Sequence, residues 1–197
     1  MSANDLWFTA RGAGLSALLV LSVATALGAL TSIKSAKPST RVVVQYVHRS
    51  AAVLGLVLIT IHVSTIVLDR KAHVGVAAVF VPFASAYKPG SVALGSIAAY
   101  TFALVAALGL ARGRMAASHN AVIAWRALHC LSYGAWAVAV LHGFNAGTDR
   151  SVGWVRLLTI GCVAIVIASV AARLMMLDDK RPPTVPSAPP RVRSGAR

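Results

Sequence analysis

The amino-acid sequence predicts an all-α integral membrane protein, a helical bundle of about five transmembrane helices. Of the 197 residues, 57% are hydrophobic and 12% are charged, and the mean hydropathy is +0.74. A soluble protein of this length has about twice that share of charged residues. The hydrocarbon core of a bilayer requires roughly 20 consecutive apolar residues in a helix, and five stretches of the sequence meet this requirement.

The five expected spans are separated by short connections and cover residues 12–31, 43–68, 91–111, 121–143 and 153–176. We expect the first span to be retained rather than cleaved as a signal peptide, because Asp5, Trp7 and Arg11 precede it in place of a basic segment. Residues 1–11 are then an extracytoplasmic N-terminal segment, and residues 12–177 form the transmembrane bundle.

Two segments outside the spans have distinct compositions. Residues 69–90 include VGVAAVFVPFASAYKP, which is apolar and aromatic but too short and too interrupted by proline to cross a bilayer. We interpret it as an interfacial or re-entrant loop on the outer face. Residues 178–197 are rich in proline, arginine and serine, and we expect them to form a disordered cytoplasmic tail.

The distribution of lysine and arginine predicts an N-out, C-in topology. In that orientation the outer side carries only six of the 19 basic residues: Arg11, Arg70, Lys71, Lys88, Arg150 and Arg156. The other 13 face the cytoplasm, as expected for a multi-pass protein of the inner (plasma) membrane. The net charge of +14 reflects this bias. Because no basic patch with interleaved aromatic residues is present, we expect the lipid bilayer, and no nucleic acid, as a partner.

Four of the six histidines lie in only two spans. His48 and His62 are 14 residues apart in the second span, and His129 and His142 are 13 apart in the fourth. Both spans run from inside to outside, so the first histidines share an inner depth and the second histidines share an outer depth, roughly 20 Å away. Two facing pairs of imidazoles can each bind a haem iron from above and below. The spacing therefore predicts two haem b groups.

The direction of each histidine around its helix fits this prediction unequally. A helix turns about 100° per residue, so 14 residues return to within about 40° of the same face, whereas 13 residues leave an offset of about 140°. The spacing of His129 and His142 therefore requires a π-bulge or kink near Gly134, or haems approached from different sides. Both alternatives remain open at this point.

Four further residues have two interpretations each. Arg49 and Arg126 lie beside the inner histidines, where a guanidinium group can pair with haem propionates or serve as an ordinary positive-inside anchor. Gly55 lies midway between His48 and His62 and either admits the edge of a macrocycle or allows close helix packing. Trp136 lies almost midway between His129 and His142, where its ring either lies between the haems or packs in the core, and core packing is its expected role.

The histidine spans resemble those of the ferric reductase-like transmembrane domain family. This family includes the membrane domains of ferric reductases and NADPH oxidases, and the haem-binding subunit of the bacterial methionine sulfoxide reductase system. The resemblance rests on the 14 and 13 spacing, on YVHRSAAVLGLVLITIHV and on WRALHCLSYGAWAVAVLHG, and it covers residues 42–176. The loop sequence VFVPFASAYKP is similar to that of stand-alone actinobacterial members. The resemblance implies that His48 and His129 bind an inner haem, and His62 and His142 an outer haem.

The chain also departs from this family. Members commonly have six core spans with ligands on the third and fifth, whereas here five spans are expected with ligands on the second and fourth. Residues 178–197 contain no Gly-rich phosphate loop and no alternation of strands and helices. We therefore expect no NAD(P)H or flavin domain in this chain, and the sequence leaves open whether the chain is an enzyme by itself.

The expected function is electron transfer across the membrane by a diheme b-type cytochrome. Its electrons would come from a cytoplasmic-side quinol or flavoprotein and pass to an extracytoplasmic acceptor. One alternative is a haem-bearing anchor subunit of a quinone-linked oxidoreductase. Another is a non-redox transporter or assembly subunit that uses the histidines as a proton relay, although the spans contain almost no acidic residues to alternate with them.

Overall fold

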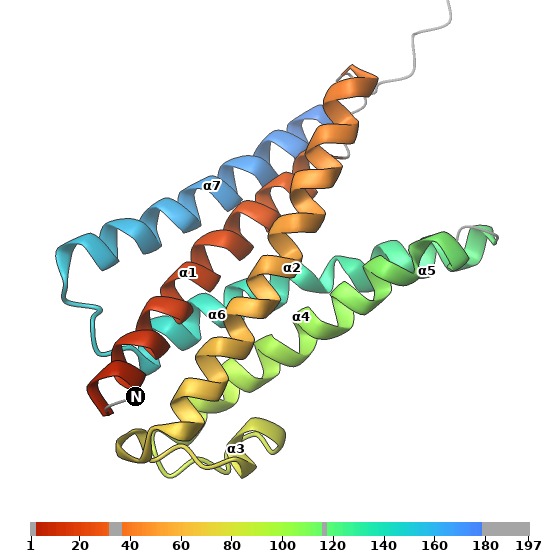
Figure 1. Ribbon diagram of the computed structural model, residues 1–197. Coiled ribbons are helices and arrows are strands. Elements are labelled where there is room, and N and C mark those ends of the chain that lie inside the picture. The colour runs from red at the N-terminus through yellow and green to blue at the C-terminus, as the bar shows by residue number, and fades with distance from the viewer. Residues whose placement is uncertain (1–2, 32–36, 116–117, 179–197) are drawn as a thin grey trace, which may run out of the picture.

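The computed structural model describes residues 3–31, 37–115 and 118–178, and all regular secondary structure in these ranges is helical. The elements, shown in Figure 1, are α1 (Ala3–Leu30), α2 (Pro38–Leu68), the 3-10 helix η1 (Arg70–Ala72), α3 (Ala77–Phe80), α4 (Pro89–Met115), α5 (His119–His129), α6 (Leu131–Ala146) and α7 (Gly153–Asp178). The predicted all-α fold is confirmed.

Five helical segments of the described chain are long and apolar enough to cross a membrane, as the sequence predicts. They are Asn4–Leu30, Pro38–Leu68, Pro89–Gly113, His119–Ala146 and Gly153–Met176, where the fourth combines α5 and α6. Helix α1 begins at Ala3, so most of the segment expected to precede the first span forms the first turns of that helix. Pro38 begins α2, at a position where its missing N–H leaves no hydrogen bond unmade.

Helix α1 lies at the centre of the bundle. It packs against α2, α6 and α7, while α4 packs against α5 and α6, and Figure 1 shows α7 on the side of α1 away from α4. In the most apolar part of α1, 44% of the residues are buried, against 11% in α2.

Trp136 belongs to a core cluster of buried residues from four helices. Its cluster includes Leu21 of α1, Phe102 of α4 and Val166 of α7. The indole Nε1 of Trp136 donates a hydrogen bond of 2.8 Å to the hydroxyl of Ser22, which is fully buried. Buried Trp N–H groups generally need such a partner. The expected role of Trp136 in core packing is thus observed.

Helix α2 exposes a long run of large apolar side chains that the other helices leave uncovered. They include Val53, Leu54, Val57 and Ile61. A contiguous apolar face of this kind is rare on a protein surrounded by water. It is the composition that a bilayer requires of a lipid-facing helix, so the exposed face agrees with a membrane-spanning bundle.

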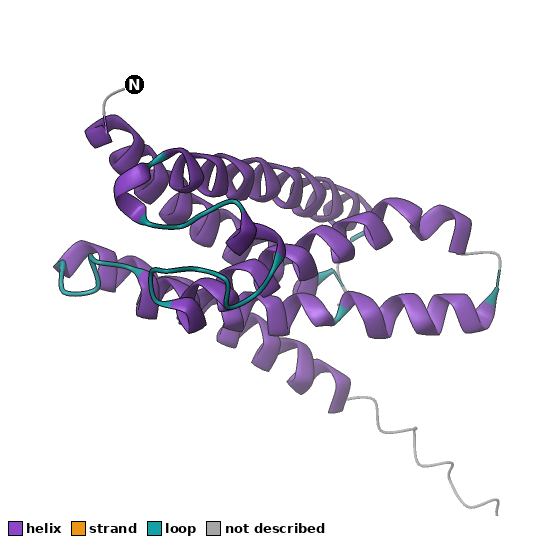
Figure 2. Cartoon of the chain, turned by 90° about the horizontal axis from the view of Figure 1, so that it is seen from below, coloured by secondary structure: helices purple, strands orange, loops and turns teal. Residues whose placement is uncertain are grey.

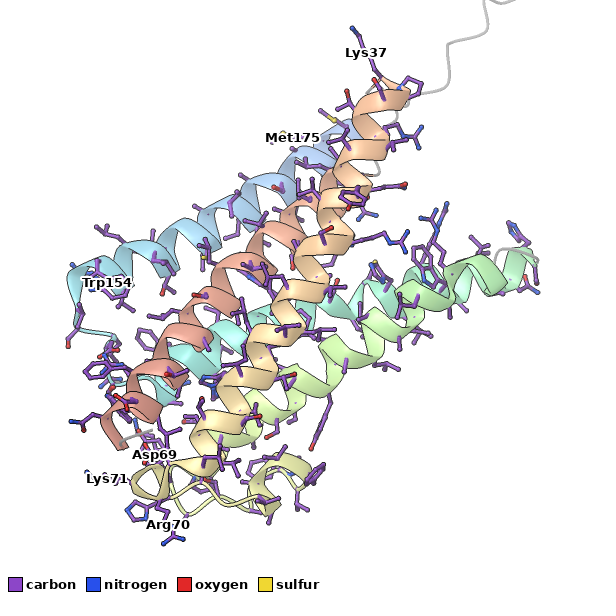
Figure 3. The ribbon with its side chains drawn as sticks, in the orientation of Figure 1. Lys37, Asp69, Arg70, Lys71, Trp154 and Met175 are labelled. Atoms are coloured by element: carbon purple, nitrogen blue, oxygen red, sulfur yellow. The ribbon has the colours of Figure 1, made fainter. Side chains whose placement is uncertain are left out.

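The two ends of the bundle separate the residues predicted to lie on opposite sides of the membrane. Figure 3 shows Lys37 and Met175 at one end and Asp69, Arg70 and Lys71 at the other. Lys37 belongs to the predicted inner set, whereas Arg70 and Lys71 belong to the outer set. The predicted cytoplasmic tail, apart from Asp178 at the end of α7, lies outside the described residues.

The connection between α2 and α4 folds back against the helices. Ser96 of α4 donates to the carbonyl oxygen of Ala78 (2.9 Å), and the Tyr100 hydroxyl donates to that of Val79. These partners lie about two and three turns into α4, so α3 lies along the side of this helix. Tyr87 donates to the carbonyl oxygen of Ala146 (3.1 Å) at the end of α6. Figure 2 shows the connection running across the end of the bundle.

Candidate functional site

Two pairs of histidine rings face each other between α2 and the helices α5 and α6. The ring centroids of His48 and His129 are 6.2 Å apart, with an angle of 67° between the ring planes. Those of His62 and His142 are 6.3 Å apart, with an angle of 80°. The four histidines predicted as ligands therefore form two separate pairs, and each histidine lies opposite the partner expected from the sequence.

The unequal spacing of the histidines is accommodated by a break between two helices. His48 and His62 lie on the single helix α2, whereas α5 ends at His129 and α6 begins two residues later, at Leu131. At the break, the N–H of Tyr133 donates to the carbonyl oxygen of Cys130 (3.1 Å), a contact over three residues that tightens the turn. The helical structure is thus interrupted at Cys130, four residues before Gly134, where a π-bulge or kink was one of the two expected solutions.

Three of the histidines bind a backbone carbonyl of a neighbouring helix through Nδ1. The donor–acceptor distances are 2.8 Å from His48 to Ala24, 2.7 Å from His62 to Ala10 and 2.7 Å from His142 to Ser91. A carbonyl oxygen only accepts hydrogen bonds, so the ring proton of each histidine is on Nδ1. The lone pair of Nε2 is then free to bind a metal ion, and the Nδ1 bond fixes the ring and increases its basicity.

His129 is held differently from the other three. The carbonyl group of Val105 faces its ring, but Nδ1 is buried without a hydrogen-bond partner among the described residues. The indole ring of Trp125 stacks on the imidazole at 5.0 Å between centroids and 20° between planes. Trp125 is itself anchored, because its Nε1 donates to the carbonyl oxygen of Leu108 (3.0 Å). Arg112 lies 5.0 Å above the same indole ring.

A glycine lies against each of the four imidazole rings. A Cβ atom on Gly14 would lie 2.9 Å from Nδ1 of His62, and one on Gly95 would lie 2.7 Å from Nδ1 of His142. The inner rings leave more room: a Cβ on Gly28 would lie 3.2 Å from Cε1 of His48, and one on Gly109 would lie 3.9 Å from Cε1 of His129. These glycines were not among the residues predicted from the sequence. Their spacing was a possible signal, because Gly14 and Gly28, like Gly95 and Gly109, are 14 residues apart, as His48 and His62 are.

The carbonyls, glycines and histidines recur with a constant offset along the chain. An offset of 81 positions relates Ala10 to Ser91, Gly14 to Gly95, Ala24 to Val105, Gly28 to Gly109, and His48 to His129. His62 and His142 are 80 positions apart, because the second unit is one residue shorter around Cys130. Two similar helical hairpins, α1–α2 and α4–α5/α6, therefore contribute equivalent halves of each histidine pair.

The donor set fits haem better than a bare metal ion. No group of three or more His, Cys, Asp or Glu side chains that could hold a metal is present in the described part of the chain, and a structural zinc site needs four protein ligands. The iron of a haem already has four ring nitrogens and needs only two axial ligands. Imidazoles on opposite sides of one metal, each bound at about 2 Å, have ring centres about 6 Å apart, close to the separations found here.

The space between the helices agrees with the same assignment. Helix α2 packs mainly against α1 and, less extensively, against α4, and it is not closely packed against α5 or α6 in the described structure. The paired histidines therefore reach toward each other between helices that are themselves apart, as a planar group held between them would require. Gly55 has another role, since a Cβ there would overlap the Leu21 side chain, so this glycine allows close packing of α1 on α2.

The two predicted arginines lie next to the inner histidines in sequence, and both have exposed side chains. Arg49 follows His48 on α2, and Arg126 lies one turn before His129 on α5. No ion pair of either arginine is found among the described residues, where the recorded salt bridge joins Arg11 and Asp149. Binding of haem propionates by these arginines therefore stays a prediction.

Comparison with known proteins adds no family assignment. No protein-family model, no curated protein and no solved structure matches the chain. The resemblance to the ferric reductase-like family therefore rests on the histidine spacing and its flanking residues, and it stays a prediction.

Substitution of Trp125 is expected to loosen the inner pair selectively. In Trp125→Ala, His129 loses the ring that stacks on it while its Nδ1 has no hydrogen bond to compensate, so the inner one of the two predicted haems should be lost first. Trp125→Phe keeps an aromatic face and should retain both haems. Haem content per chain measures the effect, and Trp154→Ala, a change at a largely exposed tryptophan, is the control. Full haem retention in Trp125→Ala would contradict a positioning role.

Proposed function

We propose that this protein is a diheme b-type cytochrome that passes single electrons across the membrane and resembles the ferric reductase-like family. The observation that carries the proposal is the presence of two facing histidine pairs, stacked along α2. With a separation of 14 residues, the two sites are roughly 20 Å apart along the helix. Two sites at these depths divide the crossing of a bilayer of about 30 Å into short steps.

The residues of the chain have defined roles in this proposal. His48 and His129 hold the inner haem, and His62 and His142 the outer haem, each through Nε2. A bound haem supplies a one-electron couple at each depth. Because two imidazoles would hold each haem, its iron would offer no free position to a substrate. Donors and acceptors therefore exchange electrons at the haem edges.

The membrane potential favours outward electron flow. With the cytoplasm negative, outward movement of one electron is favoured by about 2.3 kcal/mol per 100 mV. In the plasma membrane, with the predicted topology, the donor is a quinol or a separate flavoprotein at the cytoplasmic side. The acceptor is extracytoplasmic and approaches near residues 69–90, which follow the end of α2, where His62 of the outer pair lies six residues before Leu68.

Two other functions would use the same histidines. A haem-bearing anchor of a quinone-linked oxidoreductase would share both haems and differ only in requiring a fixed partner protein. A transporter with a proton relay would need acidic groups near the histidines. Here three of the rings bind backbone carbonyls instead. Among the described residues, Asp149 pairs with Arg11 and Asp69 accepts a hydrogen bond from the N–H of Lys71.

Transfer of electrons through sealed vesicles tests the proposal. The haem-loaded protein is reconstituted into liposomes containing trapped ferricyanide, and dithionite is added outside. We expect the trapped ferricyanide to be reduced faster than in protein-free liposomes. The matched control is the double variant His62→Ala/His142→Ala, which should lower the rate to that of empty liposomes. Equal rates with wild-type protein and with empty liposomes would contradict the proposal.

A further inference from the structure

We propose that backbone carbonyls left uncovered by glycine set the rotation of the axial imidazoles, so that the two ligand planes at each iron cross steeply. This inference rests on the proposed function, because it concerns how the histidines present themselves to haem. It assigns a positioning role to residues of α1 and α4 that do not themselves bind the metal. These residues are Ala10, Gly14, Ala24, Gly28, Ser91 and Gly95.

The plane of an imidazole ring depends on more than its bond to iron. A single bond from Nε2 to iron leaves an imidazole able to turn about that bond, so metal binding alone does not fix the ring plane. A second bond, from Nδ1 to a carbonyl oxygen of a neighbouring helix, removes this freedom. For His62 and His142 the second bond is 2.7 Å long, and its acceptor belongs to the backbone of a long helix. The helix axis thereby determines the ring plane.

Gly14 and Gly95 leave the carbonyl oxygens accessible to the imidazole rings. In a helix the Cβ of residue i+4 lies above the carbonyl of residue i, because Cα–Cβ bonds tilt toward the N-terminus. That carbonyl already accepts the N–H of residue i+4, and its second lone pair can accept another donor only if the approach is open. Gly14 and Gly95 stand at this position relative to Ala10 and Ser91. A Cβ on either glycine would lie less than 3.0 Å from the imidazole nitrogen, so only glycine leaves the approach open.

The two imidazole planes of each histidine pair cross at a steep angle. Each pair takes one imidazole oriented by α1 and one that lies against α4, and the ring planes cross at 67° in the inner pair and 80° in the outer pair. Crossed axial planes leave two of the iron d orbitals nearly equal in energy. Low-spin ferric haem then gives a highly anisotropic electron paramagnetic resonance signal, whereas parallel planes give a rhombic one.

The two sites should differ in their sensitivity to an added methyl group. At the outer site both rings are fixed by carbonyls, and both glycines are in tight contact with the ring nitrogens. At the inner site His129 is oriented by the stacked Trp125, and a Cβ on Gly109 would make only an ordinary contact at 3.9 Å. An alanine in place of Gly109 is therefore expected to be tolerated, unlike one in place of Gly14 or Gly95.

Electron paramagnetic resonance of the oxidised full-length protein, with haem quantified per chain, tests the inference. We expect highly anisotropic low-spin signals from both haems of the wild-type protein. Gly14→Ala and Gly95→Ala should each change the outer signal toward the rhombic form or release that haem. The controls are Gly109→Ala, and Gly12→Ala and Gly113→Ala, where an added Cβ would meet nothing within 4 Å. All three should leave the spectrum unchanged.

The possible outcomes separate this inference from the proposed function. Two haems per chain with rhombic signals in the wild-type protein would overturn the inference and leave the diheme assignment intact. Unchanged anisotropic signals in both Gly14→Ala and Gly95→Ala would also overturn it, since the rings would then be fixed by other contacts. Absence of haem from the folded wild-type protein would overturn the proposed function and this inference together. If one glycine variant does not fold, the other still tests the inference, and a rhombic wild-type spectrum overturns it without either variant.

Discussion

Replacement of His62 by alanine is expected to reduce the haem content from two per chain to one and to leave the inner haem spectrally unchanged. The outer pair would keep a single imidazole, on His142, where bis-histidine binding needs two. The inner pair lies roughly 20 Å away along α2 and shares no hydrogen bond with the outer pair. Haem per chain and the reduced optical spectrum of the purified protein measure the effect.

Other histidine substitutions serve as controls for this result. His142→Ala should give the same one-haem protein, because it removes the other ligand of the same pair. His73→Ala should keep both haems, since His73 is exposed in the connection between α2 and α4. Equal loss of both haems in His62→Ala, with the protein still folded, would contradict two independent sites.

The largest expected loss of stability comes from Trp136→Ala. This change empties the centre of the cluster where α1, α4, α6 and α7 meet, and it removes the donor to the buried hydroxyl of Ser22. Truncation of a buried tryptophan to alanine lowers the free energy of unfolding by about 3–5 kcal/mol in soluble proteins. Since tight packing also stabilises helices in membranes, we expect a loss of about 3 kcal/mol. Denaturation in mixed detergent micelles, followed by circular dichroism, measures it.

Two further tryptophan variants separate the sources of that loss. Trp136→Phe keeps most of the ring volume but removes the hydrogen bond to Ser22. We therefore expect the free energy of unfolding to fall by only about 1 kcal/mol. Trp154→Ala alters a side chain that is 60% exposed at the start of α7 and should change stability little. A Trp136→Ala variant as stable as the wild type would show that the cluster does not hold these helices together.

Much of the fold was accessible from the sequence because long apolar runs in this chain are helices. The predicted spans overlap the observed helices over nearly all their length, and the ends differ because helix formation continues beyond the apolar stretch, as in the early start of α1 at Ala3. The position of the break between α5 and α6 was predicted incorrectly for a different reason. It occurs at Cys130, which lacks the conformational signature of glycine or proline, and so the sequence pointed to Gly134 instead.

The candidate site was predictable only where side chains carry the chemistry. Histidine spacing identifies four rings at two depths, since a periodic helix converts sequence separation into distance. The carbonyl acceptors could not be identified in this way, because every residue has a carbonyl group and the helices must be paired before one is near a ring. The offset of 81 positions that relates Gly14 to Gly95 and Gly28 to Gly109 was present in the sequence. Only the contacts with the histidines give it a meaning.

The two histidine pairs are built alike because the two helical hairpins are similar. The residues around the two pairs differ. Trp125 stacks on a ligand of the inner pair only. The ion pair of Arg11 and Asp149 lies at the level of the outer pair along α1, since Arg11 follows Ala10, whose carbonyl binds His62. A charge pair and an aromatic ring influence a metal centre in different ways. We therefore expect the two haems to have different reduction potentials.

The reduced-minus-oxidised optical spectrum of the detergent-purified protein, with haem quantified per chain, tests the central claim most directly. The diheme assignment predicts two low-spin b-type haems per chain, both bis-histidine ligated. A folded protein that binds no haem when haem is supplied in excess would contradict it. The four histidines and their carbonyl partners would then require a function without an electron carrier.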